Sequence, residues 1–420
     1  MRARHPGRLT PLLLLLLLGC QPVAGGTENW PQFRGPNGCG RSDSARVPTR
    51  WSESENVAWK TPIHDKGWSS PVVWGDQIWL TTAKADGTQM FAVCVDRSSG
   101  RIIHDRKIFD VEHPQFCHPF NSYASPTPAI EAGRVYVHFG TYGTACLDTA
   151  TAAVIWSRRD LPCNHYRGPG SSPILYGERL FINFDGFDVQ YVIALDKKTG
   201  ATVWKKDRAI DYGTSNGDLK KAFGTPSIIE VNGRAQLVSP AAMATIAYDP
   251  QTGEELWMVR HGGMNAAAPP QFDGSKVFLC TGDGGMKLLA VRPDGRGDVT
   301  GSHIVWKEGR SVPSRTCPLL TGGRLYMVNE QGIASCLDAD SGRTVWHERL
   351  GGGFCASPVF AGGHLFFANL DGSTYVVEPG STFKLSGINK LDDGCMASPA
   401  IAGDSLLLRT KTHLYCIRGK

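Results

Sequence analysis

Short apolar stretches separated by turn residues recur along most of the chain. Residues 77–80, 134–137 and 276–279 are rich in β-branched and aromatic side chains, and Gly, Asp or Ser stands close to each of them. Short runs of this composition bounded by turn signals predict β-strands rather than helices. The pattern therefore predicts an all-β protein.

A longer unit repeats around these stretches. Its clearest copy runs from Ser172 to Lys205: a small residue and proline, a turn, an apolar strand, then Asp196, Gly200 and Trp204. Other copies start at Pro71, Pro128, Pro226, Pro270, Pro318, Pro358 and Pro399. Their spacing of roughly 40 to 57 residues suits four short strands per unit. In each turn Asp can bond the following amides, Gly accepts a positive φ, and Trp offers a flat surface to the next unit.

The last copy lacks its outer strand. After Pro399 it supplies the stretches 406–408 and 414–417, and the sequence stops at Lys420. Residues 56–60, Asn-Val-Ala-Trp-Lys, match the missing strand. We therefore predict an eight-bladed β-propeller of four-stranded blades, closed by this N-terminal strand so that no sheet edge is left open. Seven blades remain an alternative if one copy is degenerate.

The N-terminus has the pattern of an export signal. Three arginines precede an apolar run at 9–18 that is too short to span a bilayer. Residues 17–20, Leu-Leu-Gly-Cys, resemble a lipobox, in which Cys20 is lipidated; an ordinary signal peptide cut near Ala24 is the alternative. Gln21 after the cysteine favours the outer membrane. The expected organisation is 1–20 signal peptide and lipidation site, 21–55 tether and 56–420 propeller.

Charge and cysteine content narrow the functional classes. The net charge of +5 falls to +2 without the three N-terminal arginines, and no basic stripe follows, so nucleic-acid binding is not expected. Of 12 cysteines none are adjacent to one another. Most fit buried apolar positions of the repeat. A disulfide between Cys146 and Cys163, which flank one predicted hairpin, is a pairing that an oxidising envelope compartment permits.

The Ala-Leu-Asp-x-x-Thr-Gly-x-x-x-Trp copy at 194–204 resembles the PQQ-type repeat, named from pyrroloquinoline-quinone dehydrogenases. The resemblance covers roughly residues 56 to 420. The chain looks like two branches of that superfamily: the BamB-like lipid-anchored scaffolds and the quinoprotein dehydrogenases. The stretches 30–38 and 121–126 also resemble uncharacterised bacterial envelope propellers.

Each branch implies a different chemistry. A BamB-like protein is expected to bind envelope proteins or peptides as a monomer held to the membrane by a lipid, with no cofactor. A dehydrogenase would hold PQQ with Ca²⁺ and is expected to carry an adjacent-cysteine disulfide, which is missing here. A propeller that binds a small ligand or carbohydrate is the third alternative. Fold alone does not choose among them.

Candidate ligand-binding residues lie in the loops expected at the mouth of the central channel. They are Trp68, His118, Asn121, His165 and Arg167. These aromatic and basic side chains can hold an anionic or planar ligand, or they can satisfy the loop backbone instead. No metal-binding spacing is present; Asp185 and Asp188 resemble half of a calcium loop, but a lengthened hairpin is the preferred explanation. The leading hypothesis is a non-catalytic, lipid-anchored scaffold of the cell envelope.

Overall fold

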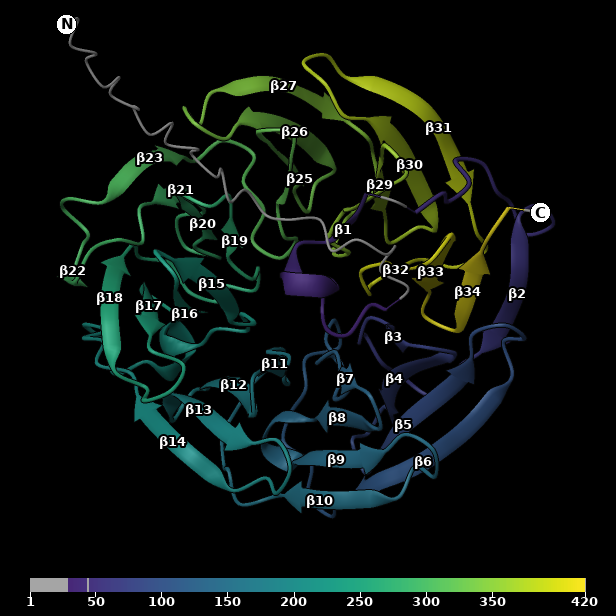
Figure 1. Ribbon diagram of the computed structural model, residues 1–420, viewed down its shortest axis with the longest axis horizontal. Helices are drawn as coiled ribbons and strands as arrows, with labels where there is room; N and C mark the ends of the chain where they lie inside the picture. Colours follow the sequence, from purple (N-terminus) through teal and green to yellow (C-terminus); the bar gives the residue numbers. More distant parts are fainter. Residues whose placement is uncertain (1–28, 44, 420) are drawn as a thin grey trace, which may run out of the picture.

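The computed structural model describes residues 29–43 and 45–419. Within these residues the chain forms eight sheets arranged as blades around a central axis (Figure 1). Six sheets contain four strands, and two carry an additional short strand. The prediction of an eight-bladed, all-β propeller is confirmed.

Blade 1 contains β3 (Val72–Trp74), β4 (Gln77–Ala83), β5 (Gln89–Asp96) and β6 (Ile102–Asp110). Blade 2 contains β7 (Ala129–Glu131), β8 (Arg134–His138), β9 (Thr144–Asp148) and β10 (Val154–Arg158). Blade 3 contains β11 (Ile174–Tyr176), β12 (Arg179–Asp185), β13 (Gln190–Asp196) and β14 (Thr202–Asp207). Blade 4 contains β15 (Ser227–Val231), β16 (Arg234–Pro240), β17 (Ala244–Tyr248) and β18 (Glu255–Arg260), with β22 (Gly297–Asp298) at its edge.

Blade 5 contains β19 (Gln271–Phe272), β20 (Val277–Cys280), β21 (Leu288–Val291) and β23 (Ile304–Glu308). Blade 6 contains β24 (Leu319–Thr321), β25 (Arg324–Val328), β26 (Ile333–Asp338) and β27 (Thr344–Arg349). Blade 7 contains β28 (Val359–Ala361), β29 (His364–Ala368), β30 (Ser373–Glu378) and β31 (Lys384–Lys390), with β1 (Arg41–Ser42). Blade 8 contains β32 (Ala400–Ala402), β33 (Ser405–Arg409), β34 (His413–Ile417) and β2 (Val57–Pro62). Short 3-10 turns are η1 (Pro36–Gly38), η2 (Gly140–Tyr142) and η3 (Gly217–Lys220).

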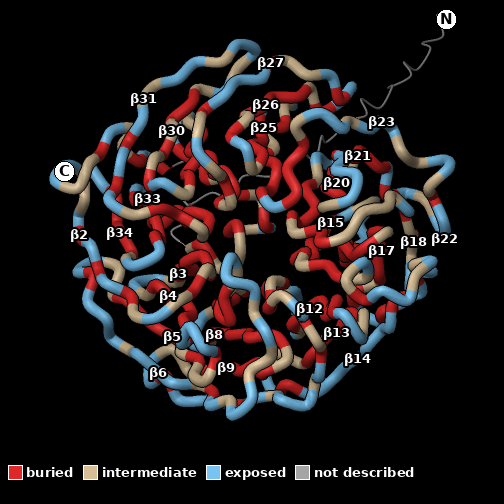
Figure 2. The backbone as a smooth tube through the Cα atoms, turned by 180° about the vertical axis from the view of Figure 1, so that it is seen from behind, coloured by how far each residue is buried: buried red, intermediate tan, exposed pale blue. Residues whose placement is uncertain are grey.

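The core lies between the blades. Second and third strands such as β4 and β5 are mostly buried, whereas the outer strand β6 is mostly exposed (Figure 2). Apolar clusters join the facing sides of neighbouring blades, as blades 4 and 5 do through Val259 and Leu289. No helix within the described residues is long and apolar enough to cross a membrane.

The tryptophan that ends one repeat packs on the turn of the next. Trp156 donates from Nε1 to the carbonyl oxygen of Lys197 at 3.0 Å. Gly200, at φ +74°, lies against the indole so closely that a Cβ atom would stand 2.6 Å from the ring. The Asp196 carboxylate accepts from the Thr199 amide at 2.8 Å and fixes this turn. Equivalent indole bonds to the following blade are made by Trp59, Trp204, Trp306 and Trp346.

The ring is closed as the sequence predicts. Strand β2 pairs antiparallel with β34, and Trp59 lies opposite Cys416. Strand β2, near the start of the chain, thus becomes the outer strand of the last blade, so that both ends of the propeller domain meet in one sheet (Figure 1).

Residues 29–55, which the sequence analysis assigns to a tether, pack against the propeller wherever they are described. Trp30 bridges Val73 of blade 1, and β1 pairs parallel with β28. Trp51 is buried and bonds the Asn389 side chain through its amide at 2.9 Å. Between these points η1 lies at the centre of the ring (Figure 1). Residues 21–28 and Cys20 lie outside the described residues.

Candidate functional site

The two faces of the ring differ in their connections. The links between blades and the loops between second and third strands share one face, here called the loop face; the tight hairpin turns share the other, the turn face. On the turn face, Asn29 accepts from the Gly75 amide and Asp404 accepts from the Arg46 amide, both at 2.8 Å. The N-terminal segment therefore enters and leaves the channel from the turn face.

Arg34 anchors this segment inside the channel. Its side chain is buried and donates from Nη1 to the carbonyl oxygen of Pro358 at 3.0 Å and from Nη2 to that of Pro318 at 3.5 Å. Gly40 lies against the guanidinium, where a Cβ would clash. The Gln271 side chain adds a bond to the Gly38 carbonyl oxygen at 3.1 Å. The motif at 30–38 is thus a plug that ties together blades from several sides of the channel.

A loop crosses the opposite mouth of the channel. The guanidinium of Arg315, ahead of blade 6, stands 4.7 Å from the ring centre of Phe120, ahead of blade 2. Blades 2 and 6 are opposite each other in a ring of eight, so this contact spans the mouth. Lys66 secures the loop by donating to the Pro119 carbonyl oxygen at 2.6 Å. A cleft of about 270 Å³ remains beside the loop, lined in part by Lys66, His118 and Tyr123.

Four predicted ligand residues, Trp68, His118, Asn121 and Arg167, lie at this loop or are hydrogen-bonded to it. Trp68 donates from Nε1 to the Phe120 carbonyl oxygen at 3.1 Å. His118 accepts at Nδ1 from the Phe120 amide at 3.1 Å, and Asn121 donates to the Arg167 carbonyl oxygen at 2.9 Å. The structure thus brings these four residues together. Trp68 and Asn121 use side-chain N–H groups for hydrogen bonds within the protein. The ligand-binding role of the four residues stays a prediction.

The fifth residue, His165, is buried beneath the loop. Its Nε2 accepts from the Thr141 amide at 3.1 Å, and burial lowers its pKa to about 4. It is therefore neutral and holds blades 2 and 3 together. Cys163 lies 3.7 Å from its Nδ1. Cys163 and Cys146 are both free thiols within one apolar cluster, and their pairing stays a prediction.

Three exposed aromatic rings form a ridge on the loop face, which sequence reasoning missed. Phe116, Tyr166 and Phe187 come from three different connections. Ring centres lie 6.4 Å apart for Phe116 and Tyr166, and 5.4 Å apart for Tyr166 and Phe187. The three residues are 60%, 42% and 38% exposed. We call this set the aromatic ridge; Leu219, 38% exposed, belongs to η3, whose Gly217 touches Phe187.

The backbone holds the ridge in a strained position. Tyr166 has a φ of +58°, which is unfavourable for a bulky residue. Its amide donates to Asn164 Oδ1 at 2.9 Å, and the Asn164 carbonyl oxygen accepts from the Phe187 amide at 2.7 Å. The Asn164 amide in turn donates to Asp188 at 2.8 Å. These hydrogen bonds hold Tyr166 in an unfavourable backbone conformation while its ring is exposed to solvent. Backbone outliers of this kind are common at functional sites.

Cations underlie the ridge. The buried ammonium of Lys221 lies 5.0 Å from the Tyr166 ring centre and is ion-paired with Asp218. Arg167 Nη2 bonds the same carboxylate at 3.0 Å. Burial lowers the pKa of Lys221. Two cations sharing one carboxylate leave a positive charge below an apolar surface.

The residues near the axis do not fit PQQ with a calcium ion. Among residues 29–43 and 45–419, no three His, Cys, Asp or Glu side chains gather as metal ligands. Asp185 is paired with Arg208 at 2.6 Å, and Asp188 Oδ1 accepts from the Asn164 and Val189 amides, so both carboxylates already take part in contacts within the protein. Moreover, the Phe120 loop lies over the mouth.

Arg409 is another buried arginine that the sequence did not reveal. Its Nη1 donates to the carbonyl oxygen of Ser69 at 2.9 Å and to its Oγ at 2.6 Å, and burial lowers its pKa to about 9. Gly67 leaves room for the guanidinium. These contacts join blade 8 to blade 1 and complete the ring.

The geometry defines a closed eight-bladed propeller of the PQQ-like repeat class. The model of the family described as "Outer membrane protein assembly factor BamB" matches residues 44–238, 188–296 and 296–382. The chain belongs to this family.

Relatives come from both branches of the superfamily. The chain is 22% identical over 251 residues to the outer membrane protein assembly factor BamB of Yersinia pestis, covering 59% of this chain and 60% of that protein. It is 29% identical over 197 residues to a quinoprotein ethanol dehydrogenase of Pseudomonas aeruginosa, covering 44% of this chain and 29% of that protein. The matches thus span less than two thirds of either relative.

Solved structures show the same fold. The BamB of Moraxella catarrhalis matches with a TM-score of 0.59 at 12% identity, covering 86% of this chain and 99% of that one. The quinohemoprotein alcohol dehydrogenase of Comamonas testosteroni matches with a TM-score of 0.67 at 12% identity, covering 94% and 82%. At this identity the likeness concerns the fold alone.

Proposed function

We propose that this protein is a non-catalytic scaffold of the bacterial cell envelope and that the aromatic ridge binds an extended segment of a partner protein. The observation that carries the proposal is the exposed contact of Phe116, Tyr166 and Phe187 on a strained, well-bonded loop. Contiguous exposed aromatic groups are typical of protein-binding surfaces. The family's description as an outer membrane protein assembly factor supports the same class of function.

The charge around the ridge indicates the chemistry of the partner. Arg167 and Lys221 share Asp218, and Lys220 lies 5.8 Å from the Tyr212 ring centre. A segment with apolar side chains beside acidic residues would match both the rings and these cations. The hydrogen bonds of Asn164 to Tyr166, Phe187 and Asp188 hold the ridge in place before binding, which reduces the conformational entropy lost on binding.

Site-specific crosslinking in cells tests the proposal. A photoreactive amino acid at Leu219 reports partners beside the ridge, and the test variant is Phe116→Ser with Phe187→Ser. The control is Ile103→Ser with Ile388→Ser, since these residues are 44% and 54% exposed on outer strands away from the ridge. We expect the ridge variant to lose about nine tenths of the crosslinked product and the control to keep it. Equal products from both variants would contradict the ridge as the binding surface.

We further propose that Cys20 carries a lipid that holds the scaffold to the outer membrane. The lipobox-like residues 17–20 and the family description support this location. A Cys20→Ala protein should lose its lipid, as mass spectrometry of the mature N-terminus would show, and should leave the membrane fraction. Unchanged processing and membrane association would remove the anchor from the proposal and leave the ridge untouched.

A further inference from the structure

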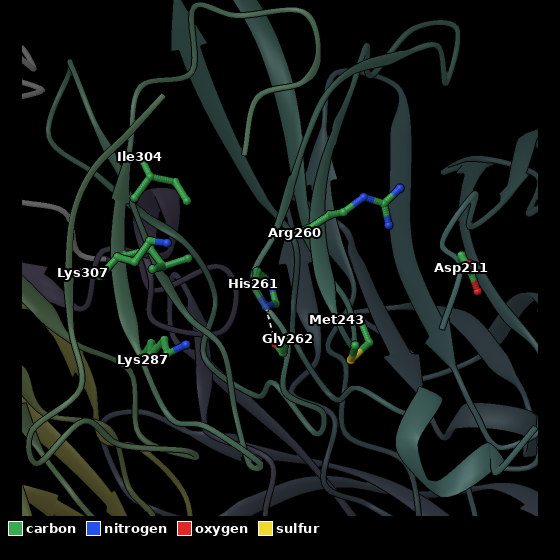
Figure 3. Close-up of a pocket in the computed structure, with 9 residues that line it drawn as sticks. Asp211, Met243, Arg260, His261, Gly262, Lys287, Ile304 and Lys307 are labelled. Atoms are coloured by element: carbon green, nitrogen blue, oxygen red, sulfur yellow. Dashed lines mark hydrogen bonds between the residues drawn. The ribbon is translucent and has the colours of Figure 1, made fainter. Parts of the chain in front are cut away.

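A cleft opens between blades 4 and 5 and shares no lining residue with the three rings of the aromatic ridge. It encloses about 270 Å³. Lys287 and Lys307 lie on one side, and Met243, His261 and Gly262 lie on the other (Figure 3). Blades 4 and 5 pack tightly through Val259 and Leu289 deeper in the same interface. The cleft is the point where this apolar packing ends.

Strand register directs both lysines into the cleft. Lys307 on β23 pairs with Leu289 on β21, which is buried and lines the floor. Lys287 directly precedes β21 and lies two residues from Leu289, so it shares the same sheet face. Both ammonium groups therefore stand above an apolar floor to which Ile304 also contributes.

The positive charge in the cleft is not neutralised. Neither lysine forms an ion pair with any residue that the structure describes. Arg260 adds a third cation on the opposite wall and is bonded to Asp298 at 3.1 Å. Asp211 is the one carboxylate among the lining residues. Like charges held close to an apolar surface favour an anion between them.

Beside Arg260, the opposite wall is formed by the uncharged groups of His261, Gly262 and Met243. His261 places its Nδ1 2.6 Å from the Gly262 carbonyl oxygen and its Nε2 3.1 Å from Thr245 Oγ1, which together engage both ring nitrogens. Burial lowers its pKa to about 4, so the ring is neutral at pH 7. Met243 has a φ of +68°, and its backbone exchanges bonds with Gly263 and His261. This wall thus presents a fixed thioether and imidazole surface to any ligand.

We propose that the cleft binds a small organic anion, a carboxylate or phosphate monoester on an apolar group, with its anionic end between Lys287 and Lys307. The apolar group would rest on Leu289, Ile304 and Met243. The two ammonium groups supply charge-assisted hydrogen bonds, and the apolar wall favours organic anions over inorganic ones. This binding site is independent of the aromatic ridge and of the scaffold function.

Calorimetric titration of the purified full chain tests the proposal with four probes: phenyl phosphate, benzoate, inorganic phosphate and benzyl alcohol. We expect saturable binding of phenyl phosphate or benzoate, weaker binding of inorganic phosphate, and none of benzyl alcohol. The comparison of the first two identifies which anionic group is preferred. Binding should weaken as salt rises from ~0.05 to ~0.5 M, because the charges are exposed.

Matched variants locate the site. Lys287→Met and Lys307→Met keep the aliphatic stems and should each weaken binding about tenfold, whereas Lys287→Arg should keep most of it. Lys206→Met is the control, since Lys206 is an exposed lysine on β14. If neither organic anion shows saturable binding below about 10 mM, its binding free energy is weaker than ~3 kcal/mol, and the proposal is overturned. The proposal is also overturned if a variant that carries both Lys287→Met and Lys307→Met binds the organic anions as tightly as the wild-type protein. Equal affinity of the wild-type protein for benzyl alcohol and for the organic anions would overturn it too. None of these outcomes bears on crosslinking at the ridge.

Discussion

Trp59 donates from its indole Nε1 to the carbonyl oxygen of Arg97 at 3.0 Å. Trp59 belongs to the strand that completes blade 8, and Arg97 belongs to a turn of blade 1. Gly100 in the same turn lies flat against the indole. The contact that joins consecutive blades elsewhere thus also joins the last blade to the first, and the ring closes with the same interaction that builds it.

Gly100 should be more sensitive to substitution than a glycine that needs only its backbone conformation. Gly100→Ala forces a Cβ at φ +74° to within 2.6 Å of the Trp59 ring, whereas Gly133→Ala, at φ +78°, meets no atom within 4 Å. We expect Gly133→Ala to lower the free energy of unfolding by about 1 kcal/mol and Gly100→Ala by about 3 kcal/mol. Urea unfolding measures both. Equal losses would show that the indole contact does not tighten the ring closure.

The plug should contribute strongly to stability. Arg34→Met removes the guanidinium and leaves the carbonyl oxygens of Pro318 and Pro358 without its hydrogen bonds. Because unpaired buried acceptors cost ~1–3 kcal/mol each, the free energy of unfolding should fall by about 3 kcal/mol or more. Arg41→Met is the control, since Arg41 pairs at 2.7 Å with the exposed Asp43 and should contribute under ~1 kcal/mol. If both variants unfold at the same urea concentration, the segment does not act as a plug.

The closing strand could be predicted because it repeats a pattern. Residues 56–60 match the outer strand of other copies, and Trp59 occupies the position of Trp156 and Trp204. Arg34 repeats nothing, and its bonds join it to residues 284 and 324 positions away. Sequence spacing carries no signal for such contacts. For that reason the stretch at 29–55 looked like a tether, although its described part is packed.

The candidate ligand residues, too, could be predicted only as far as they follow the repeat. Trp68, His118, Asn121 and Arg167 could be placed together because each follows an outer strand of the repeat, which fixes its face of the ring. The ridge could not be predicted, because the exposure of Phe116 and Tyr166 depends on how two irregular connections fold. Local glycines and asparagines indicate a loop but not its direction. The opposed walls of the cleft between blades 4 and 5 likewise depend on blade packing.

Pyrroloquinoline quinone with Ca²⁺ should not bind to the central mouth. The Phe120 ring against Arg315 and the absence of a ligand cluster among the described residues do not suit the quinone and its metal. Fluorescence titration of the full chain should show no saturable change at high micromolar quinone, with or without calcium. Alcohol-dependent dye reduction should stay at the level of a buffer blank. Saturable quinone binding with alcohol-dependent turnover would favour the dehydrogenase over the scaffold and make these loops an active site.

Buried histidines should make the fold sensitive to mild acid. Burial lowers the pKa of His138 to about 3 and of His165 and His261 to about 4. The folded protein therefore keeps these rings neutral, while the unfolded chain protonates them near pH 6.5. Their contribution is complete above pH 6.5 and is lost as pH falls toward 4. At pH 5 each histidine should cost about 2 kcal/mol of the stability present at pH 7.

Urea unfolding of the wild-type protein at pH 7 and pH 5 measures this loss directly. Carboxylates contribute little to the difference, because they titrate mainly below this window. His113→Gln is the control, since the side chain of His113 is 90% exposed and its removal should leave the pH dependence unchanged. His165→Gln should reduce the slope by about one third if it folds. A wild-type protein equally stable at both pH values would mean that the buried rings accept protons in the folded state, against their packing beside Thr141 and Thr245.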